Sequence, residues 1–231
     1  LTFDIKKGEI FAIVGPSGTG KSVTLKHMVR LLTPTRGAVW VDEVEVSAVN
    51  GDELARMRER FGYLFQGGAL LGWMTVEENI ALPLREKTRL TESQIEERVM
   101  KALHAVGLEQ DGGKYPSEIS GGMQKRAGLA RAIVREPEIV LYDEPTSGLD
   151  PVTSRTIDQL IRRLNVELGI TSVVVTHDLQ GALLIADRIA MLTGGRFVEV
   201  SPPKTFVATD QPDVRGFLDA QFISKKGLEG F

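Results

Sequence analysis

Residues 15 to 22 read GPSGTGKS, a spacing of glycines, lysine and serine that is typical of a loop that binds nucleotide phosphates. Glycine lets the backbone curl so that its N–H groups converge on a phosphate where any Cβ would intrude. The Lys21 ammonium can then reach the β- and γ-phosphates, and the Ser22 hydroxyl can ligate Mg²⁺. The predicted nucleotide-binding residues are Gly15, Pro16, Ser17, Gly18, Thr19, Gly20, Lys21, Ser22 and Val23.

Two adjacent carboxylates follow the apolar run of IVLYDEP, residues 139 to 145. Burying carboxylates at the end of a strand costs free energy unless a positive charge lies beside them. A Mg²⁺ ion held by phosphates and Ser22 would supply that charge, so we expect Asp143 to be a direct or outer ligand of the metal. Glu144 is then predicted to deprotonate a water aimed at the γ-phosphate. Without the phosphate loop, the same pair is more often a helix cap or a loop.

Two further polar residues close predicted strands, Gln66 after FGYLF and His177 after TSVVVT. The carboxyl ends of parallel strands meet at one edge of a sheet, where ligands bind. We therefore predict that Gln66 bridges Mg²⁺ and the attacking water, and that His177 hydrogen-bonds the γ-phosphate. Taken alone, a histidine at a strand end is usually an ordinary surface or core residue.

A second candidate anion site lies in SEISGGMQKRAGLARA, residues 117 to 132, where adjacent glycines precede a helix. Unpaired N–H groups and the helix dipole both favour an anion at a helix N-terminus. A plainer interpretation, compatible with the first, is a capped amphipathic helix with a solvated basic face formed by Lys125, Arg126 and Arg131.

The flanking pattern predicts the elements that position these residues. A strand at 9–14 precedes the phosphate loop, and Leu25, Met28, Val29 and Leu32 follow at helical spacing. The further predicted strands are 38–42, 61–66, 138–143, 171–177 and 188–193, with a hairpin through Gly194 and Gly195 into 196–201. Because several strands are apolar on both faces and separated by helical segments, we expect a mainly parallel sheet covered by helices.

Residues 67–136 have a different texture and contain no convincing strand. Thr91 and Gln94 form a capping box, and an apolar helical stripe then runs to Gly107. A second helix is expected from Ser120, with Met123 on its apolar face. We predict an α/β core at 1–66 and 137–205 that ends in the hairpin, an inserted α-helical subdomain at 67–136, and a C-terminal helical tail at 206–231.

Composition narrows the function classes. The 231-residue chain has 28 Lys and Arg against 31 Asp and Glu, a net charge of -3, which implies no strong attraction to nucleic acid or anionic lipid. The absence of cysteine excludes a disulfide framework and a Cys-based metal site or nucleophile. No apolar run reaches the roughly 18 to 20 residues that cross a bilayer, so any membrane action is expected to need another subunit. The chain opens at Leu1 in what reads as a strand, and we expect that N-terminal sequence is missing.

Together these motifs resemble the nucleotide-binding subunits of ABC transporters. The carrying residues, in chain order, are the phosphate loop at 15–22, Gln66, SGGMQ at 120–124, IVLYDE at 139–144, SGLD at 147–150 and His177. The resemblance implies a P-loop NTPase core that uses ATP and Mg²⁺. It also implies a head-to-tail homodimer, in which Ser120, Gly121 and Gly122 of one copy close over the γ-phosphate held by the other. Asp150 would cross the same interface.

The resemblance also implies partners. A transmembrane permease subunit, present in two copies, would insert a helix into a groove near residues 67–79. The segment is unusually apolar for a loop, which favours a binding site, although its side chains would also suit packing inside the helical insert. Its apolar residues are Leu70, Leu71, Trp73 and Met74. A small accessory subunit, no nucleic acid, and a peripheral location on the cytoplasmic face of a bacterial inner membrane complete the expectation.

Departures from the common pattern narrow the family. Met123 stands where the signature usually has glutamine, and it cannot donate the glutamine's hydrogen bonds. This methionine and several other stretches are similar to the ATPases of Mla and Mce-type lipid transport systems, which move lipids between bacterial membranes. Those stretches are RAGLARAI, FQGGALL at 65–71, NIALPLRE at 79–86 and VRGFLDAQF at 214–222. The alternatives are an ABC ATPase for another substrate class and a soluble ABC-type switch in translation or DNA repair.

The family usually stacks adenine on an aromatic residue well before the phosphate loop. Phe3 and Phe11 lie too close to Gly15 for that role, so we expect that this aromatic residue is not in the chain.

Overall fold

A computed structural model describes residues 1–221 and 223, and its centre is a six-stranded sheet with parallel pairing except at one edge. In spatial order the strands are β4 (Phe61–Leu64), β5 (Ile139–Asp143), β6 (Thr171–Thr176), β1 (Ile10–Val14), β7 (Arg188–Thr193) and β8 (Arg196–Ser201). Only β8 runs antiparallel to its neighbour. The expected mainly parallel α/β sheet is confirmed.

The hairpin between β7 and β8 turns through Gly194 and Gly195, as predicted. Their φ angles are 54° and 74°, and positive φ at both central residues is what a type I′ hairpin turn requires.

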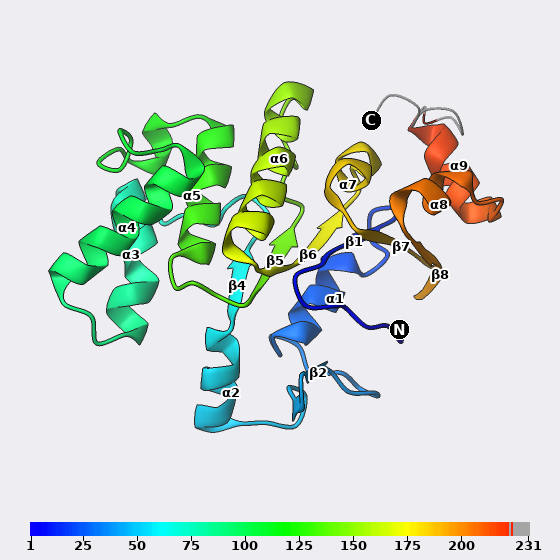
Figure 1. The fold of residues 1–231 in the computed structure, drawn as a ribbon, viewed down its shortest axis with the longest axis horizontal. Helices are drawn as coiled ribbons and strands as arrows, with labels where there is room; N and C mark the ends of the chain where they lie inside the picture. The colour runs from blue at the N-terminus through cyan, green and yellow to red at the C-terminus, as the bar shows by residue number, and fades with distance from the viewer. Residues whose placement is uncertain (222, 224–231) are drawn as a thin grey trace.

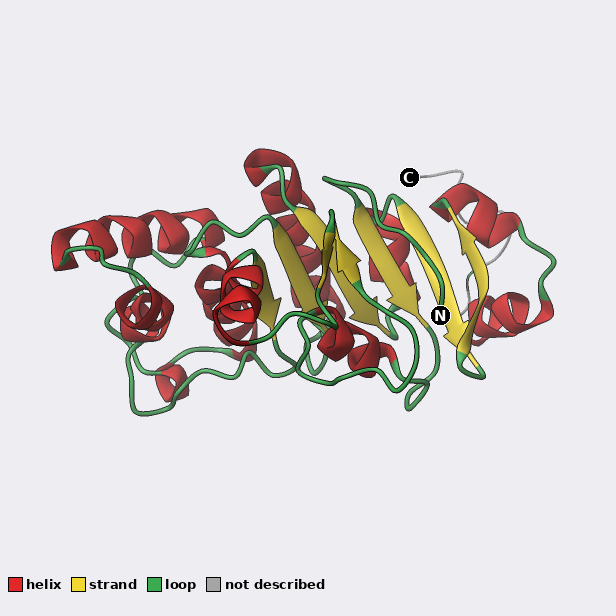
Figure 2. Ribbon diagram, turned by 90° about the horizontal axis from the view of Figure 1, so that it is seen from below, coloured by secondary structure: helices red, strands yellow, loops and turns green. Residues whose placement is uncertain are grey.

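Alternate residues of β1 point to opposite faces of the sheet, and helices cover both faces (Figure 2). Phe11 and Ile13 pack with Leu25 of α1 (Lys21–Met28), which covers one face. The other face carries α6 (Pro151–Leu168) and α7 (Leu179–Ile185). This burial on both sides explains why β1 reads as a continuous apolar run.

The predicted helical insert is built from three helices beyond the β4 edge of the sheet (Figure 1). They are α3 (Val76–Lys87), α4 (Glu92–Val106) and α5 (Gly121–Ile133), with a short 3₁₀ helix, η1 (Pro116–Glu118), between the last two. The capping box of Thr91 and Gln94 and the left-handed cap at Gly107 are both present, as predicted. One apolar cluster runs from the sheet into these helices, and the boundary of the insert stays a prediction.

The start of α3 was missed by the sequence reasoning, which treated residues 67–79 as one loop. Thr75 caps this helix, and its hydroxyl and the Glu78 carboxylate form a capping box. The helix therefore begins at Val76, inside the segment expected to line the groove.

Two elements in the N-terminal part of the chain are shorter than predicted. The helix after the phosphate loop ends at Met28, because Arg30 adopts a left-handed φ of 52° that reverses the chain and leaves Leu32 41% exposed. The strand predicted at 38–42 shrinks to β2 (Trp40–Val41), which pairs only with β3 (Val44–Glu45), in a separate two-stranded sheet.

The remaining described segments complete the fold. Helix α2 (Gly51–Glu59) leads into β4, and residues 1–6 are irregular rather than a strand. The C-terminal region holds α8 (Pro203–Ala208) and α9 (Pro212–Ala220), which lie beside β8 (Figure 1). Buried Phe206, Val214 and Leu218 join them to the core.

The structure does not describe residue 222 or residues 224–231, which belong to the predicted tail. Phe222 is the last residue of the stretch VRGFLDAQF. Within the described part of the chain, no helix combines the length and the apolar character that crossing a bilayer requires.

A close backbone contact joins α5 to the sheet at Gly62 of β4. A Cβ at Gly62 would lie 2.3 Å from the carbonyl oxygen of Ala132. We therefore expect Gly62→Ala to lower the free energy of unfolding by about 1 to 3 kcal/mol, because the strand or α5 must move. Urea denaturation followed by circular dichroism measures this. Gly113→Ala, where a Cβ meets nothing within 4 Å, is the control, and equal midpoints for the two variants would refute the contact's importance.

Candidate active site

The phosphate loop connects β1 to α1, and its glycines are required by geometry. Gly15 has a φ of 147°, and a Cβ there would lie 2.3 Å from the carbonyl oxygen of Leu192. Gly20 caps α1 with a φ of 100° and has no side chain that could accept hydrogen bonds from the first turn. The N–H groups at the start of α1 are therefore available to an anion.

Lys21 lies buried between the loop and the carboxylates at the end of β5. Its Nζ donates to the carbonyl oxygens of Gly15 at 2.9 Å and Pro16 at 3.1 Å. The same Nζ is 3.7 Å from Oε1 of Glu144. The fold thus brings together a cation and an acid that are far apart in the sequence.

Ser22 and Asp143 meet as the sequence predicts. The Ser22 hydroxyl donates to Oδ1 of Asp143 at 2.6 Å. Tyr63, which the sequence reasoning missed, donates its hydroxyl to Oδ2 at 3.3 Å. Burial and the nearby Asp143 charge both raise the pKa of Tyr63, so it remains a donor. The sequence placed Tyr63 in the strand predicted at 61–66, and only the structure pairs this strand with β5.

The pair of Ser22 and Asp143 fits a magnesium ion. A hydroxyl and a carboxylate are hard oxygen donors, and Mg²⁺ usually takes one or two such ligands together with substrate phosphates. No group of three or more His, Cys, Asp or Glu side chains that could hold a metal by itself occurs among the residues that the structure describes.

Glu144 and His177 are in direct contact at the ends of β5 and β6. Nδ1 of His177 lies 2.7 Å from Oε2 of Glu144, and the His177 backbone N–H donates to the same oxygen at 3.3 Å. The Glu144 carboxylate, predicted to deprotonate a water, is held here by His177 and faces Lys21. The imidazole is 58% exposed, so its second nitrogen remains open to a ligand.

Gln66 lies beyond the strand that was predicted to end with it. Strand β4 stops at Leu64, which pairs in register with Tyr142, and Gln66 is exposed in the segment that follows. Because β4 and β5 are parallel, Gln66 still leaves the sheet at the edge where Asp143 and Glu144 lie.

The serine and glycines of the second anion motif form the start of α5. Ser120 caps the helix, and its hydroxyl accepts from the Met123 N–H at 3.3 Å. Gly121 is exposed, whereas Gly122 is buried against α6, where a Cβ would lie 2.6 Å from Cγ2 of Thr153. Close packing within one chain therefore requires Gly122, and the cross-chain role of these residues stays a prediction.

Asp150 has a role within its own chain as the cap of α6. Its carboxylate accepts from the N–H groups of Val152 and Thr153, both at 3.0 Å, and from the Thr153 hydroxyl. The Thr153 hydrogen bonds hold the pKa of Asp150 below its ordinary value. Its predicted crossing of a dimer interface stays a prediction.

The predicted solvated basic face of α5 is wrong. Lys125 is buried, with 5% exposure. Arg126 donates to two carbonyls at the C-terminal end of α4, and Arg131 donates to two carbonyls in the 67–79 segment. The helical pattern assigned these cations to solvent because it does not show that α5 is surrounded by other elements.

The apolar segment after Gln66 is only partly exposed. Trp73 is 76% exposed, whereas Leu70, Leu71 and Met74 are half-buried. Buried Asn79, another residue that the sequence reasoning missed, organises this segment by binding the backbone of Leu71, Met74 and Thr75.

Gln221 at the end of α9 reaches the histidine loop. Its Nε2 donates to the His177 carbonyl at 2.9 Å, and its Oε1 accepts from the Leu179 N–H at 3.1 Å. No sequence pattern pointed to this contact, because 44 residues separate the two partners.

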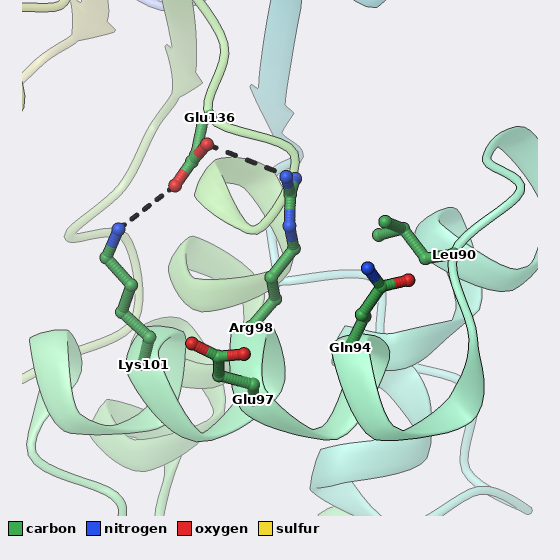
Figure 3. Close-up of a pocket in the computed structure, with 6 residues that line it drawn as sticks. All are labelled: Leu90, Gln94, Glu97, Arg98, Lys101 and Glu136. Atoms are coloured by element: carbon green, nitrogen blue, oxygen red, sulfur yellow. Dashed lines mark hydrogen bonds and ion pairs between the residues drawn. The ribbon is translucent and has the colours of Figure 1, made fainter.

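A surface hollow of about 300 Å³ lies over α4, and none of the residues that line it is a predicted site residue (Figure 3). Arg98 and Lys101 of α4 converge there on Glu136, with the Lys101 Nζ 3.0 Å from its carboxylate. These cations hold the pKa of Glu136 below its ordinary value, Lys101 most strongly. The ion pairs fasten α4 to the segment between α5 and β5 and do not form part of the nucleotide site.

Comparisons with known proteins agree with this geometry. The family described as "ABC transporter" matches residues 1–147. The "Intermembrane phospholipid transport system ATP-binding protein MlaF" of Haemophilus influenzae is 44% identical over 96% of this chain and 84% of that protein. The "Probable ribonucleotide transport ATP-binding protein mkl" of Mycobacterium leprae is 45% identical over 99% of this chain, which spans 66% of that relative's length.

A solved structure has the same fold. The ATP-binding cassette MJ0796, described as dimeric in a post-hydrolysis state with ADP and Pi, superposes with a TM-score of 0.79 at 37% identity. The match covers 87% of this chain and 88% of that cassette.

The Gln221 contact predicts a local change in dynamics. Gln221→Ala removes both hydrogen bonds, so we expect the Leu179 amide to exchange roughly fivefold faster, which corresponds to a loss of about 1 kcal/mol. Hydrogen exchange followed by mass spectrometry of the 177–185 peptide measures this. Gln94→Ala, which removes an amide at the start of α4, is the control and should leave this peptide unchanged. Unchanged exchange in the Gln221 variant would show that the contact is not formed in solution.

Proposed function

This chain belongs to the ABC transporter family as an ATPase cassette, and we propose that it powers a bacterial transporter that moves phospholipids or related lipids between membranes. The observation that carries the catalytic part is the Glu144 carboxylate, held between Lys21 and His177 beside the phosphate loop. An acid, a cation and a loop of available N–H groups are what phosphoryl transfer to water needs.

In the proposed reaction the loop from Gly15 to Ser22 binds the ATP phosphates through its backbone and Lys21. Ser22, Asp143 and Gln66 would hold Mg²⁺, which neutralises phosphate charge when bound. Glu144 accepts a proton from the attacking water as the water oxygen bonds to the γ-phosphorus, and the bond from that phosphorus to the bridging oxygen breaks, so that ADP and phosphate leave. His177 fixes the Glu144 carboxylate and offers its other nitrogen to the γ-phosphate.

We propose that two copies share each ATP. The N-terminus of α5, with Ser120 and Gly121 exposed, presents N–H groups that favour an anion. In a head-to-tail homodimer, Ser120, Gly121 and Gly122 of one copy would cover the γ-phosphate on the other, with Asp150 nearby. The dimeric state described for the cassette MJ0796 supports this arrangement.

The lipid substrate rests on a relative that this chain covers along most of its length. The MlaF protein named for intermembrane phospholipid transport matches along 84% of its length, compared with 66% for the relative named for ribonucleotide transport. The methionine at position 123 and the motifs around it support the same assignment. Transport of another substrate class is the competing function, because the ribonucleotide-named relative is 45% identical.

A membrane permease is the proposed partner. Exposed Trp73 and the half-buried apolar residues beside it form a surface suited to a helix from that subunit. We propose two permease copies, a small accessory subunit, and a peripheral position on the cytoplasmic face of the inner membrane.

The Glu144 assignment predicts separate effects on binding and hydrolysis. Glu144→Gln should keep ATP affinity, lower kcat by about 10²-fold or more and accumulate a closed dimer, because the amide cannot accept the proton. Phosphate release and light scattering with Mg²⁺ and ATP measure this. Lys21→Ala should instead abolish nucleotide binding. Hydrolysis at the parental rate in the Glu144 variant would contradict its role as the base.

The substrate assignment is tested on the full-length protein purified with its membrane subunits. We expect mass spectrometry to find phospholipid bound to the complex, and phospholipid vesicles to raise its ATPase rate above that with detergent alone. Stimulation by a ribonucleotide or an amino acid but not by phospholipid would overturn the lipid assignment. Recovery of ribosomes or DNA in place of a membrane subunit would favour a soluble switch.

A further inference from the structure

Lys125 of α5 is a buried cation that the proposed reaction does not use. Its side chain is 5% exposed, although helical spacing would place it among solvated basic residues. Its Nζ donates to the carbonyl oxygen of Glu144 at 3.2 Å and to the hydroxyl of Ser147 at 3.2 Å. A buried lysine is costly unless its hydrogen bonds and charge are matched, so this arrangement requires an explanation.

The group that Lys125 contacts is an unusual piece of backbone. Glu144 has a φ of 50°, a left-handed conformation that is costly for a residue with a side chain and persists only where its surroundings fix it. Its N–H donates to the Val175 carbonyl at 2.9 Å. Its carbonyl oxygen accepts from the Ser147 hydroxyl at 2.9 Å as well as from Lys125.

These donors determine where the Glu144 side chain points. With the peptide held on one side by β6 and on the other by Lys125 and Ser147, the carboxylate lies 2.7 Å from His177 and 3.7 Å from Lys21. A backbone rotation at Glu144 would move the carboxylate away from both. The position of the Glu144 carboxylate therefore depends on the left-handed conformation of its backbone.

Charge explains why a lysine occupies this position. The adjacent carboxylates of Asp143 and Glu144 are both buried, and Lys21 is the cation on the phosphate-loop side. Lys125 approaches the same segment from α5. Burial lowers the pKa of Lys125, whereas the charges of Glu144 and Asp143 oppose that shift.

We propose that Lys125 is a positioning residue for ATP hydrolysis, which fixes the left-handed peptide of Glu144 so that its carboxylate meets the attacking water. The inference rests on the proposed role of Glu144 as the base. Lys125 lies on α5, the helix that Ser120 caps. In the proposed dimer, the start of α5 covers the ATP that the partner copy holds, whereas Glu144 acts on the ATP that its own copy holds. Helix α5 therefore links the two ATP sites. Placement of the base would therefore follow the position of α5.

The test compares two neutral replacements of similar size in the full-length protein. Lys125→Met removes the donor and the charge, and we expect kcat to fall about 10²-fold because a small displacement of a reacting group has an effect of that size. Lys125→Gln keeps a donor, and we expect a fall of about 10-fold. In both variants the KM and the affinity for ATP should stay within about twofold of the parent, since neither touches the phosphate loop.

The control applies the same chemical change to an exposed lysine. Lys101→Met removes the ion pair with Glu136 over α4, and its kcat should match that of the parent. A role in packing alone would make Lys125→Met at least as active as Lys125→Gln, which would overturn the proposal. Parental kcat in either Lys125 variant, or a loss of ATP affinity that equals the loss of rate, would also overturn it.

Further comparisons test the positioning role if one variant does not fold, and they separate it from the proposed role of Glu144 as the base. If Lys125→Met does not fold, the rate of Lys125→Gln decides alone, with a fall of about 10-fold in support and the parental rate against. If Glu144→Gln hydrolyses ATP at the parental rate, the proposed base is wrong. If Glu144→Gln is inactive while both Lys125 variants are fully active, only the positioning role fails.

Discussion

Burial of two adjacent carboxylates at the end of β5 is the constraint on which the site depends. Asp143 and Glu144 leave water as the sheet is covered, and unpaired charges in such a place would destabilise the fold. Ser22 and Lys21 of α1 contact these carboxylates, and Lys125 of α5 donates to the backbone carbonyl oxygen of Glu144. The contacts that stabilise these buried carboxylates are therefore also the contacts that build the site.

The parallel sheet makes these contacts possible, because it places the ends of β1, β4, β5 and β6 at one edge. The phosphate loop, Gln66, the carboxylates and His177 leave the sheet there, although they are spread over most of the chain. Helix α9 adds a contact from outside this edge through Gln221. The resemblance to ABC transporter ATPases, made from ordered motifs, is confirmed by the family match and by the solved cassette.

Several local patterns that neighbouring residues decide were predicted correctly, although the capping box at Thr75 was missed. The capping box at Thr91, the cap at Gly107 and the turn at Gly194 depend on a few adjacent residues, and each is present. Errors occurred where distant packing decides. The apolar face through Leu32 overestimated α1, and the polar pattern of α5 assigned Lys125 to solvent.

The sequence by itself determined which chemical groups the protein has and which strand or loop carries them, because motif spacing and hydrophobic period are properties of neighbouring residues. The tertiary structure alone decided the partners of those groups. It placed Tyr63 on Asp143, His177 on Glu144 and a buried lysine on the Glu144 carbonyl. Such contacts join residues far apart in the chain, and their geometry is fixed by strand register and helix packing, which a linear pattern does not contain.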